Sequence, residues 1–364
     1  MHSETCCAGK PDHTPKKLLG LGLACLLALA IFLALPVPRG QANDQRPAVN
    51  LPLQLEWVGT VRSAADVTGN PSRLKWLFRK IMGTSDSEKT LNMPYGIAID
   101  RQGRMLVADT KGRVVHLFDP AKRKYKVLRA PDSDPFLAPI AVALDPQGNI
   151  YVSDSMRSRL FVFNAEGKFK RTIGALGKNE SIFKRCTGIA IDAQRGRLYV
   201  VDTVAMNIVV LDLNGKVIQR IGHRGADAGE FNYPTQISVA QDGSLWVTDS
   251  LNFRVQHLSA DGKPVSGFGR LGDGVGEFDK AKGIALDEHN NIYLVDGMRD
   301  RVQVFSPEGR LLFFFGTTGA GPGEFFLPTG ITVDHSRIYV GDGYNRRVQI
   351  FQLRANAGNP GAGQ

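Results

Sequence analysis

Cysteine is scarce in this chain of 364 residues, and its distribution excludes two kinds of stabilisation. Three of the four cysteines, Cys6, Cys7 and Cys25, fall within the first 25 residues. Because only Cys186 lies in the remainder, neither an internal disulfide nor a cysteine-rich metal site can form there. The hydrophobic fraction of 43% supplies enough material for a packed core, which must provide the stability instead.

Acidic residues are missing from two basic segments of a chain whose formal net charge is +10. The cations of residues 70–83 are Arg73, Lys75, Arg79 and Lys80, and those of residues 122–129 are Lys122, Arg123, Lys124, Lys126 and Arg129. Basic patches of this kind attract polyanions, anionic lipid head groups or acidic proteins, although each can also be an ordinary solvated surface.

The first 42 residues differ from the rest and predict an export signal. Lys16 and Lys17 precede an uncharged run over 18–38, and Gly40 and Ala42 offer the small residues that a signal peptidase requires. The run is also long enough to cross a bilayer, so a cleaved signal peptide and a retained signal anchor both remain open. In either case the chain is expected to be exported, either periplasmic or anchored to the outer side of the cytoplasmic membrane.

An internal repeat decides the expected fold. Six second strands, of which IYVSD and LYVVD are typical, end in aspartates spaced 45, 48, 47, 47 and 46 residues apart: Asp109, Asp154, Asp202, Asp249, Asp296 and Asp342. Each repeat also contains a GIAID-like first strand, a third strand and a fourth strand, separated by turn residues. Four short strands in a repeat of this length predict an all-β, six-bladed β-propeller over residues 43–353.

The last repeat lacks a fourth strand, which predicts how the ring closes. The sequence LQLEWVGTV of residues 53–61 is similar to the fourth strands of the other repeats. We expect this N-terminal strand to complete the last blade and so to remove a free sheet edge. Residues 354–364 are expected to form a disordered tail.

The motifs GIAID, DSLNFRVQHL, DGMRDRVQVF and DGYNRRVQIF, with three linkers ending in GEF, resemble those of NHL-repeat propellers over residues 53–353. This resemblance implies the fold but not one function, because NHL-type propellers include lyases, RNA-binding modules, receptor sensor domains and protein-binding scaffolds. A zinc-dependent lyase of this type would need histidines where the first strands open. Those openings read MPYG, APIA, CTGI, YPTQ, AKGI and LPTG, and none contains histidine.

The repeated aspartates and the isolated cysteine have simple structural interpretations. An aspartate present in every blade serves every blade, so each is expected to accept hydrogen bonds from its own loop. Cys186 is expected to be packed rather than nucleophilic. The sequence therefore predicts no catalytic residue, no metal and no cofactor.

The loops after the aspartates predict an interaction face, because apolar residues, arginine and methionine are typical of interfaces. The predicted binding residues are Met156, Arg157, Met206, Leu251, Phe253, Met298, Arg299, Tyr344 and Arg346. A short helix over residues 71–82 is expected to lie over the same face as a lid. Its predicted contact residues are Leu74, Trp76, Leu77, Phe78 and Ile81. Alternatively, this basic helix contacts a membrane surface, a polyanion or a partner.

The sequence thus favours a non-enzymatic, exported binding or scaffold propeller that recognises a protein or an extended ligand of the cell envelope. Two alternatives stay open. One is a lyase or hydrolase with a site in the channel, and the other is a binder of acidic polysaccharide or anionic lipid. No nucleic-acid partner is expected.

Overall fold

The computed structural model describes residues 53–69, 89–174 and 181–355. The predicted export segment over 1–42, the predicted lid helix over 71–82 with Leu74, Trp76, Leu77, Phe78 and Ile81, and the tail beyond Ala355 lie outside these residues. Within the described ranges, no helix has the length and hydropathy needed to cross a bilayer.

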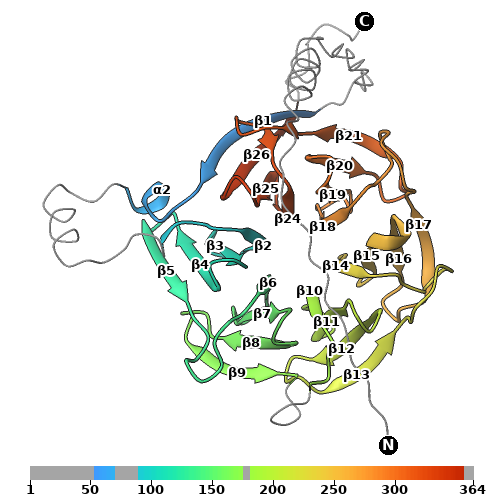
Figure 1. The fold of residues 1–364 in the computed structure, drawn as a ribbon, viewed down its shortest axis with the longest axis horizontal. Coiled ribbons are helices and arrows are strands. Elements are labelled where there is room, and N and C mark those ends of the chain that lie inside the picture. Colours follow the sequence, from blue (N-terminus) through green and yellow to red (C-terminus); the bar gives the residue numbers. More distant parts are fainter. Residues whose placement is uncertain (1–52, 70–88, 175–180, 356–364) are drawn as a thin grey trace, which may run out of the picture. The chain divides into compact units, whose positions relative to one another are not determined.

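Six four-stranded antiparallel sheets form a ring, which confirms the predicted six-bladed propeller (Figure 1). Blade 1 contains β2 (Pro94–Ile99), β3 (Met105–Asp109), β4 (Val114–Asp119) and β5 (Lys124–Leu128). Blade 2 contains β6 (Pro139–Leu144), β7 (Ile150–Asp154), β8 (Arg159–Phe163) and β9 (Phe169–Ile173). Blade 3 contains β10 (Cys186–Asp192), β11 (Arg197–Asp202), β12 (Asn207–Asp212) and β13 (Val217–Ile221).

The second half of the ring repeats this plan. Blade 4 contains β14 (Pro234–Val239), β15 (Leu245–Asp249), β16 (Arg254–Leu258) and β17 (Pro264–Phe268). Blade 5 contains β18 (Ala281–Leu286), β19 (Ile292–Asp296), β20 (Arg301–Phe305) and β21 (Leu311–Phe315). Blade 6 contains β24 (Pro328–Asp334), β25 (Arg337–Asp342) and β26 (Arg347–Ala355). Shorter elements in the connections are α2 (Ala65–Thr68), η2 (Ser250–Asn252), β22 (Thr317–Thr318) and β23 (Glu324–Phe325).

The ring closes as the sequence predicts. Strand β1 (Leu53–Val61) pairs antiparallel with β26 and supplies the fourth strand of blade 6. The pairing extends to Leu53 opposite Ala355, so β26 runs two residues beyond the end that the sequence predicts for the propeller. Val61 is buried in the cluster between blades 6 and 1, which links the closing strand to both ends of the ring.

The core consists of six apolar clusters, each between two neighbouring blades. Strand residues alternate between the two faces of a sheet, and here both faces are covered by a neighbouring blade. In β7, for example, Tyr151 packs toward blade 3 while Val152 packs toward blade 1. The second strands are therefore apolar at nearly every position, because neither of their faces meets water.

Candidate functional site

The two faces of the ring differ in which connections they carry. The first residue of each innermost strand pairs with the aspartate that ends the second strand, as Pro234 does with Asp249. The linkers between blades therefore reach the same face as the loops after the aspartates, as the sequence predicts. We call this face the linker face. The opposite face carries the turns that join first to second and third to fourth strands, and we call it the turn face.

The repeated aspartates hold the linker face together, which confirms their structural interpretation. Asp154 accepts hydrogen bonds from Leu137 N and Ala138 N of the incoming linker, and from Met156 N and Arg157 N of its own loop. Asp202 likewise accepts from Lys184 N and Arg185 N. Among the described residues, no group of acidic, histidine or cysteine side chains could hold a metal ion.

The RVQ sequence that begins the third strand of blades 4, 5 and 6 contacts the GEF sequence that ends the linker before the same blade. Arg347 donates to Asp342 at 2.7 Å and to the carbonyl oxygens of Ala320, Gly321 and Glu324 in the linker. Gln349 donates to the Glu324 carbonyl oxygen at 2.6 Å. The phenylalanines that end the three motifs, Phe231, Phe278 and Phe325, are fully buried. These motifs therefore attach each linker to its blade and leave the loop tips free for other roles.

The loop tips carry a rim of exposed apolar side chains. The fourth residue after each of the six aspartates adopts a left-handed conformation. Its φ lies between 50°, at Asp300, and 55°, at Arg113. This turn directs the second residue after the aspartate outward. The members of the apolar rim are Met156, Val204, Leu251, Met298 and Tyr344, with exposed fractions of 68, 47, 51, 52 and 55%. Blade 1 has Lys111 at the corresponding position.

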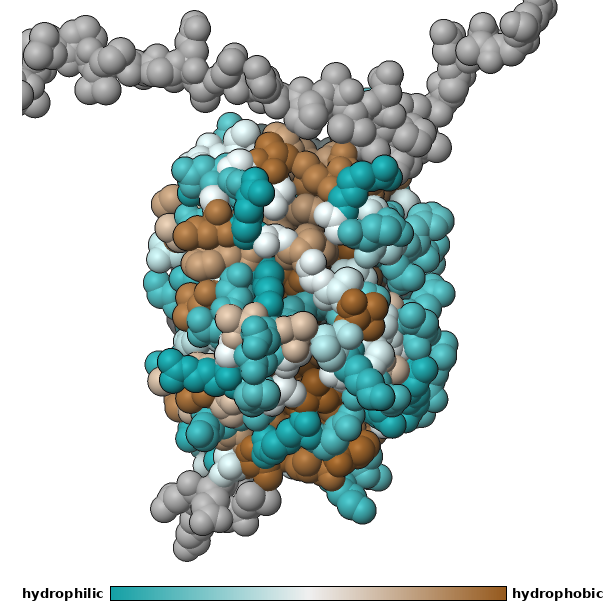
Figure 2. Space-filling view, turned by 90° about the vertical axis from the view of Figure 1, so that its right-hand side faces the viewer, coloured by the Kyte–Doolittle hydropathy of each residue, from teal (hydrophilic) through white to brown (hydrophobic). Residues whose placement is uncertain are grey.

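Within the described part of the chain, no exposed large apolar residue lies on the turn face. Thirteen such residues occur, and eight of them lie on the linker face: the apolar rim together with Leu271, Val275 and Phe326. The other five belong to outermost strands: Trp57, Val58, Val217, Ile218 and Val265. The wall of the ring is a mosaic in which hydrophobic and hydrophilic areas alternate (Figure 2). The apolar surface is therefore concentrated on the linker face.

The other predicted binding residues have different environments. Arg157 donates to the Pro135 carbonyl oxygen at 2.9 Å, and Arg299 forms ion pairs with Asp273 and Asp279, so both arginines stabilise linkers. Met206 is partly buried against the cluster between blades 3 and 4, so only part of its side chain is available to a partner. Phe253 ends the η2 turn with φ 54°, and its side chain is half-buried.

Arg346 is exposed beside Tyr344 and remains on the predicted face. The basic segment over residues 122–129 lies elsewhere, because it occupies a turn of the turn face and the outermost strand β5. Any polyanion that binds this segment would therefore use a surface separate from the apolar rim. The other basic segment, over residues 70–83, lies outside the described residues.

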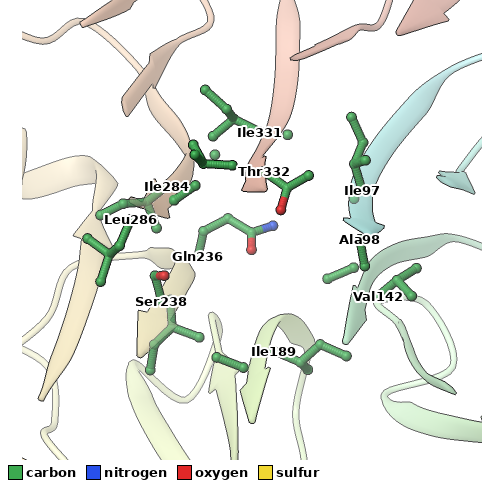
Figure 3. A pocket seen from close by; sticks show the side chains of 18 of the residues that line it. Ile97, Ala98, Val142, Ile189, Gln236, Ser238, Ile284, Leu286, Ile331 and Thr332 are labelled. Atoms are coloured by element: carbon green, nitrogen blue, oxygen red, sulfur yellow. The ribbon is translucent and has the colours of Figure 1, made fainter. Parts of the chain in front are cut away.

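The axis of the ring holds a cavity of about 320 Å³, lined by the six innermost strands. Inner strands approach closely where Gly330 faces blade 1, since a Cβ there would lie 2.0 Å from the Tyr95 carbonyl oxygen. Blade 4 places Gln236 at the corresponding position, and Figure 3 shows its side chain in the middle of the channel with Thr332 turned toward it. None of the residues that line the cavity is titratable.

Polar groups gather instead at the linker-face end of this channel. Arg185 Nη1 donates to the Tyr233 hydroxyl at 3.1 Å. Burial raises the pKa of Tyr95 to about 12, against the opposing effect of the Arg185 charge. Burial also lowers the pKa of Lys282 to about 8, and the nearby Lys280 charge adds to this effect. These residues carry no sequence motif, and histidine, the residue type that a zinc-dependent lyase would place at the blade openings, is absent from those openings.

Cys186 and two of the described histidines, His116 and His257, occupy packed positions within the blades. Cys186 is fully buried, its Sγ lies 3.4 Å from the Asp154 and Arg159 carbonyl oxygens, and burial raises its pKa, so the thiol stays protonated. His116 is buried between Asp109 and Tyr125, at 3.2 and 2.8 Å. His257 stacks on Trp246 with ring centroids 4.1 Å apart, within blade 4. Neither histidine lines the channel.

Solved structures with this architecture include binding proteins and enzymes. A protein of unknown function from Bacteroides thetaiotaomicron has a TM-score of 0.61 at 18% identity, covering 83% of this chain and 76% of that chain. An auxiliary nutrient binding protein from the same organism has a TM-score of 0.58 at 13% identity, covering 72% of this chain and 69% of that chain.

A catalytically inactive histidine-to-alanine variant of virginiamycin B lyase from Staphylococcus aureus, with quinupristin, has a TM-score of 0.55 at 13% identity. The match covers 83% of this chain and all of that chain. Identities this low show a shared fold and do not transfer a function. A family described as a six-bladed β-propeller matches residues 128–223, 189–255 and 289–356, more than half of the chain. Together with the six observed blades, this match shows that the chain belongs to that six-bladed β-propeller family.

Proposed function

We propose that this protein is an exported, non-enzymatic binding propeller of the NHL-repeat type, which docks a protein partner of the cell envelope on its linker face. The apolar rim carries the proposal, because exposed methionine, leucine and tyrosine side chains on one face are typical of protein interfaces. The RVQ and GEF motifs support the NHL assignment, since they form the same linker contacts in blades 4 and 6.

A rim variant tests this proposal. Met156→Lys, Leu251→Lys and Met298→Lys combined should abolish capture of envelope proteins by the full-length chain in a crosslinking pull-down. A matched control carries Val58→Lys, Ile218→Lys and Val265→Lys, which replace exposed apolar residues of outermost strands. The control should capture the same proteins as the wild type. Equal capture by the rim variant, with unchanged thermal unfolding, would show that the partner does not dock on the rim.

A lyase-type enzyme is the second candidate, and the observation in its favour is the Lys282 amine with its pKa lowered to about 8. Against it, the described residues place no histidine or carboxylate on the channel lining to act beside such a base. The two candidates differ in the effect of Lys282→Met. This variant would abolish the turnover of a lysine-dependent enzyme, whereas a binding propeller has no turnover to lose and would still capture its envelope partners through the apolar rim, although more weakly.

A further inference from the structure

The linker-face entrance of the channel, which we call the channel mouth, has an unusual composition. Each blade contributes two residues to this entrance, namely those directly before and after the first residue of its innermost strand. In blade 5, for example, Lys280 and Lys282 flank Ala281. Their charged and aromatic members are Tyr95, Arg185, Tyr233, Lys280 and Lys282. None of the flanking residues is acidic, so the mouth has three cations and no carboxylate of its own.

Three of these side chains converge over the axis. Arg185 in blade 3 is hydrogen-bonded to Tyr233 in blade 4. Tyr95 in blade 1 directly precedes Gly96, which lines the axial cavity, and its pKa responds to the Arg185 and Tyr233 side chains. Blades 1 and 4 stand on opposite sides of the ring, as β2 and β14 show in Figure 1. A side chain of blade 1 can approach Tyr233 only by reaching across the mouth, so the phenols and the guanidinium lie over the end of the channel.

Among the described residues, the cations of the mouth have no carboxylate partner. Lys282 Nζ donates to the Pro328 carbonyl oxygen at 3.3 Å, and no described carboxylate lies within ion-pair distance of Lys282, Lys280 or Arg185. The nearby aspartates are occupied elsewhere, since Asp296 accepts from the Asp279 and Lys280 backbone and Asp300 accepts from Thr318 and Leu327. A poorly solvated ammonium without an anion is costly to maintain, and a bound anion would offset that cost.

We propose that the channel mouth is an anion site that receives a carboxylate, supplied by an acidic side chain of the partner that docks on the apolar rim. This inference rests on the proposed docking function and adds the chemistry of its centre. Arg185, Tyr95, Tyr233 and Lys282 supply donors that match a carboxylate, and the surrounding rim excludes water from the contact. A buried charge pair ringed by apolar contacts fixes the orientation of the partner.

Competitive acetylation of the full-length protein tests the site without a natural partner. Acetic anhydride reacts with unprotonated amines, so mass spectrometry of the Lys282 peptide reports the protonation and access of this amine. The probes are acetyl-Phe-Glu-Phe-amide and its glutamine analogue, which have equal apolar content. The glutamate peptide should raise the pKa of Lys282 by about one unit and so slow its acetylation about tenfold, since one pKa unit is a tenfold change in unprotonated amine. The glutamine peptide should have little effect.

One variant of the mouth and one control variant complete the experiment. Arg185→Gln should reduce the protection by the glutamate peptide, whereas Lys216→Met, which removes an exposed cation of the turn face, should leave it intact. Equal protection by both peptides, no protection at all, or stronger protection by inorganic phosphate would overturn the carboxylate site. These outcomes say nothing against docking on the rim, because the rim variant and its partner capture are measured separately.

Discussion

At the residue scale, the environment of Lys282 is unfavourable for its positive charge. Its pKa falls from 10.5 to about 8 because burial and the Lys280 charge disfavour the ammonium, while the charges of Asp300 and Asp296 oppose the shift. The unfolded chain therefore binds this proton more tightly, and the free energy of unfolding should rise as the pH increases from about 8 to 10.5.

Replacing Lys282 by methionine should therefore stabilise the unliganded protein below pH 8, by about 1–3 kcal/mol. The difference from the wild type should shrink as the pH approaches 10. Urea unfolding of both proteins between pH 6 and 10 measures this difference, and Lys216→Met controls for the loss of one surface charge. A constant difference across this range would contradict a perturbed Lys282.

Two arginines of β26 allow a matched comparison of buried and exposed ion pairs. Arg347 and Asp342 are almost fully buried at 2.7 Å, whereas Arg354 and Glu56 pair at the same distance in solvent. Arg347→Met should cost about 3–5 kcal/mol because it leaves Asp342 and three linker carbonyl oxygens short of donors. Arg354→Met should cost less than about 1 kcal/mol. Chemical denaturation of both variants decides whether the RVQ motif stabilises its linker.

At the element scale, the closing strand β1 holds the two ends of the ring together. It covers the free edge of β26 and buries Val61 between blades 6 and 1. Deletion of residues 53–61 should lower the thermal unfolding midpoint and promote association through the exposed edge. Deletion of residues 356–364 is the control and should change neither property. An unchanged midpoint and solubility after the first deletion would show that closure contributes little.

At the scale of the whole molecule, we expect residues 1–42 to direct export, so that the linker face meets its partner outside the cytoplasm. A C-terminal alkaline phosphatase fusion to the full-length chain should be active, because this reporter requires an oxidising compartment outside the cytoplasm. Removing residues 1–42 should abolish its activity. Mass spectrometry of the mature N-terminus would then distinguish cleavage after Ala42 from a retained anchor. An active fusion without residues 1–42 would refute the assigned role of this segment.

The sequence by itself determined the number of blades, their strand order and the closing strand. These features follow from local patterns, such as the regularly spaced aspartates and the missing fourth strand after Phe351. The strand pattern can be recognised in each repeat on its own, without knowledge of the contacts between repeats. The structural role of the aspartates was also predictable, because an Asx side chain bonds to the backbone of its own loop. The exposure of Met156, Leu251, Met298 and Tyr344 followed from the same loop pattern.

Only the tertiary structure decided which side chains meet around the axis. Tyr95, Arg185 and Tyr233 come from three blades far apart in the sequence, and they converge because the closed ring brings the innermost strands together. Met206 shows a second such effect, since it lies in the same kind of loop as the apolar rim but is partly buried against the cluster between blades 3 and 4. A repeat pattern fixes what is the same in every blade, but contacts between blades depend on ring closure and on the differences among blades.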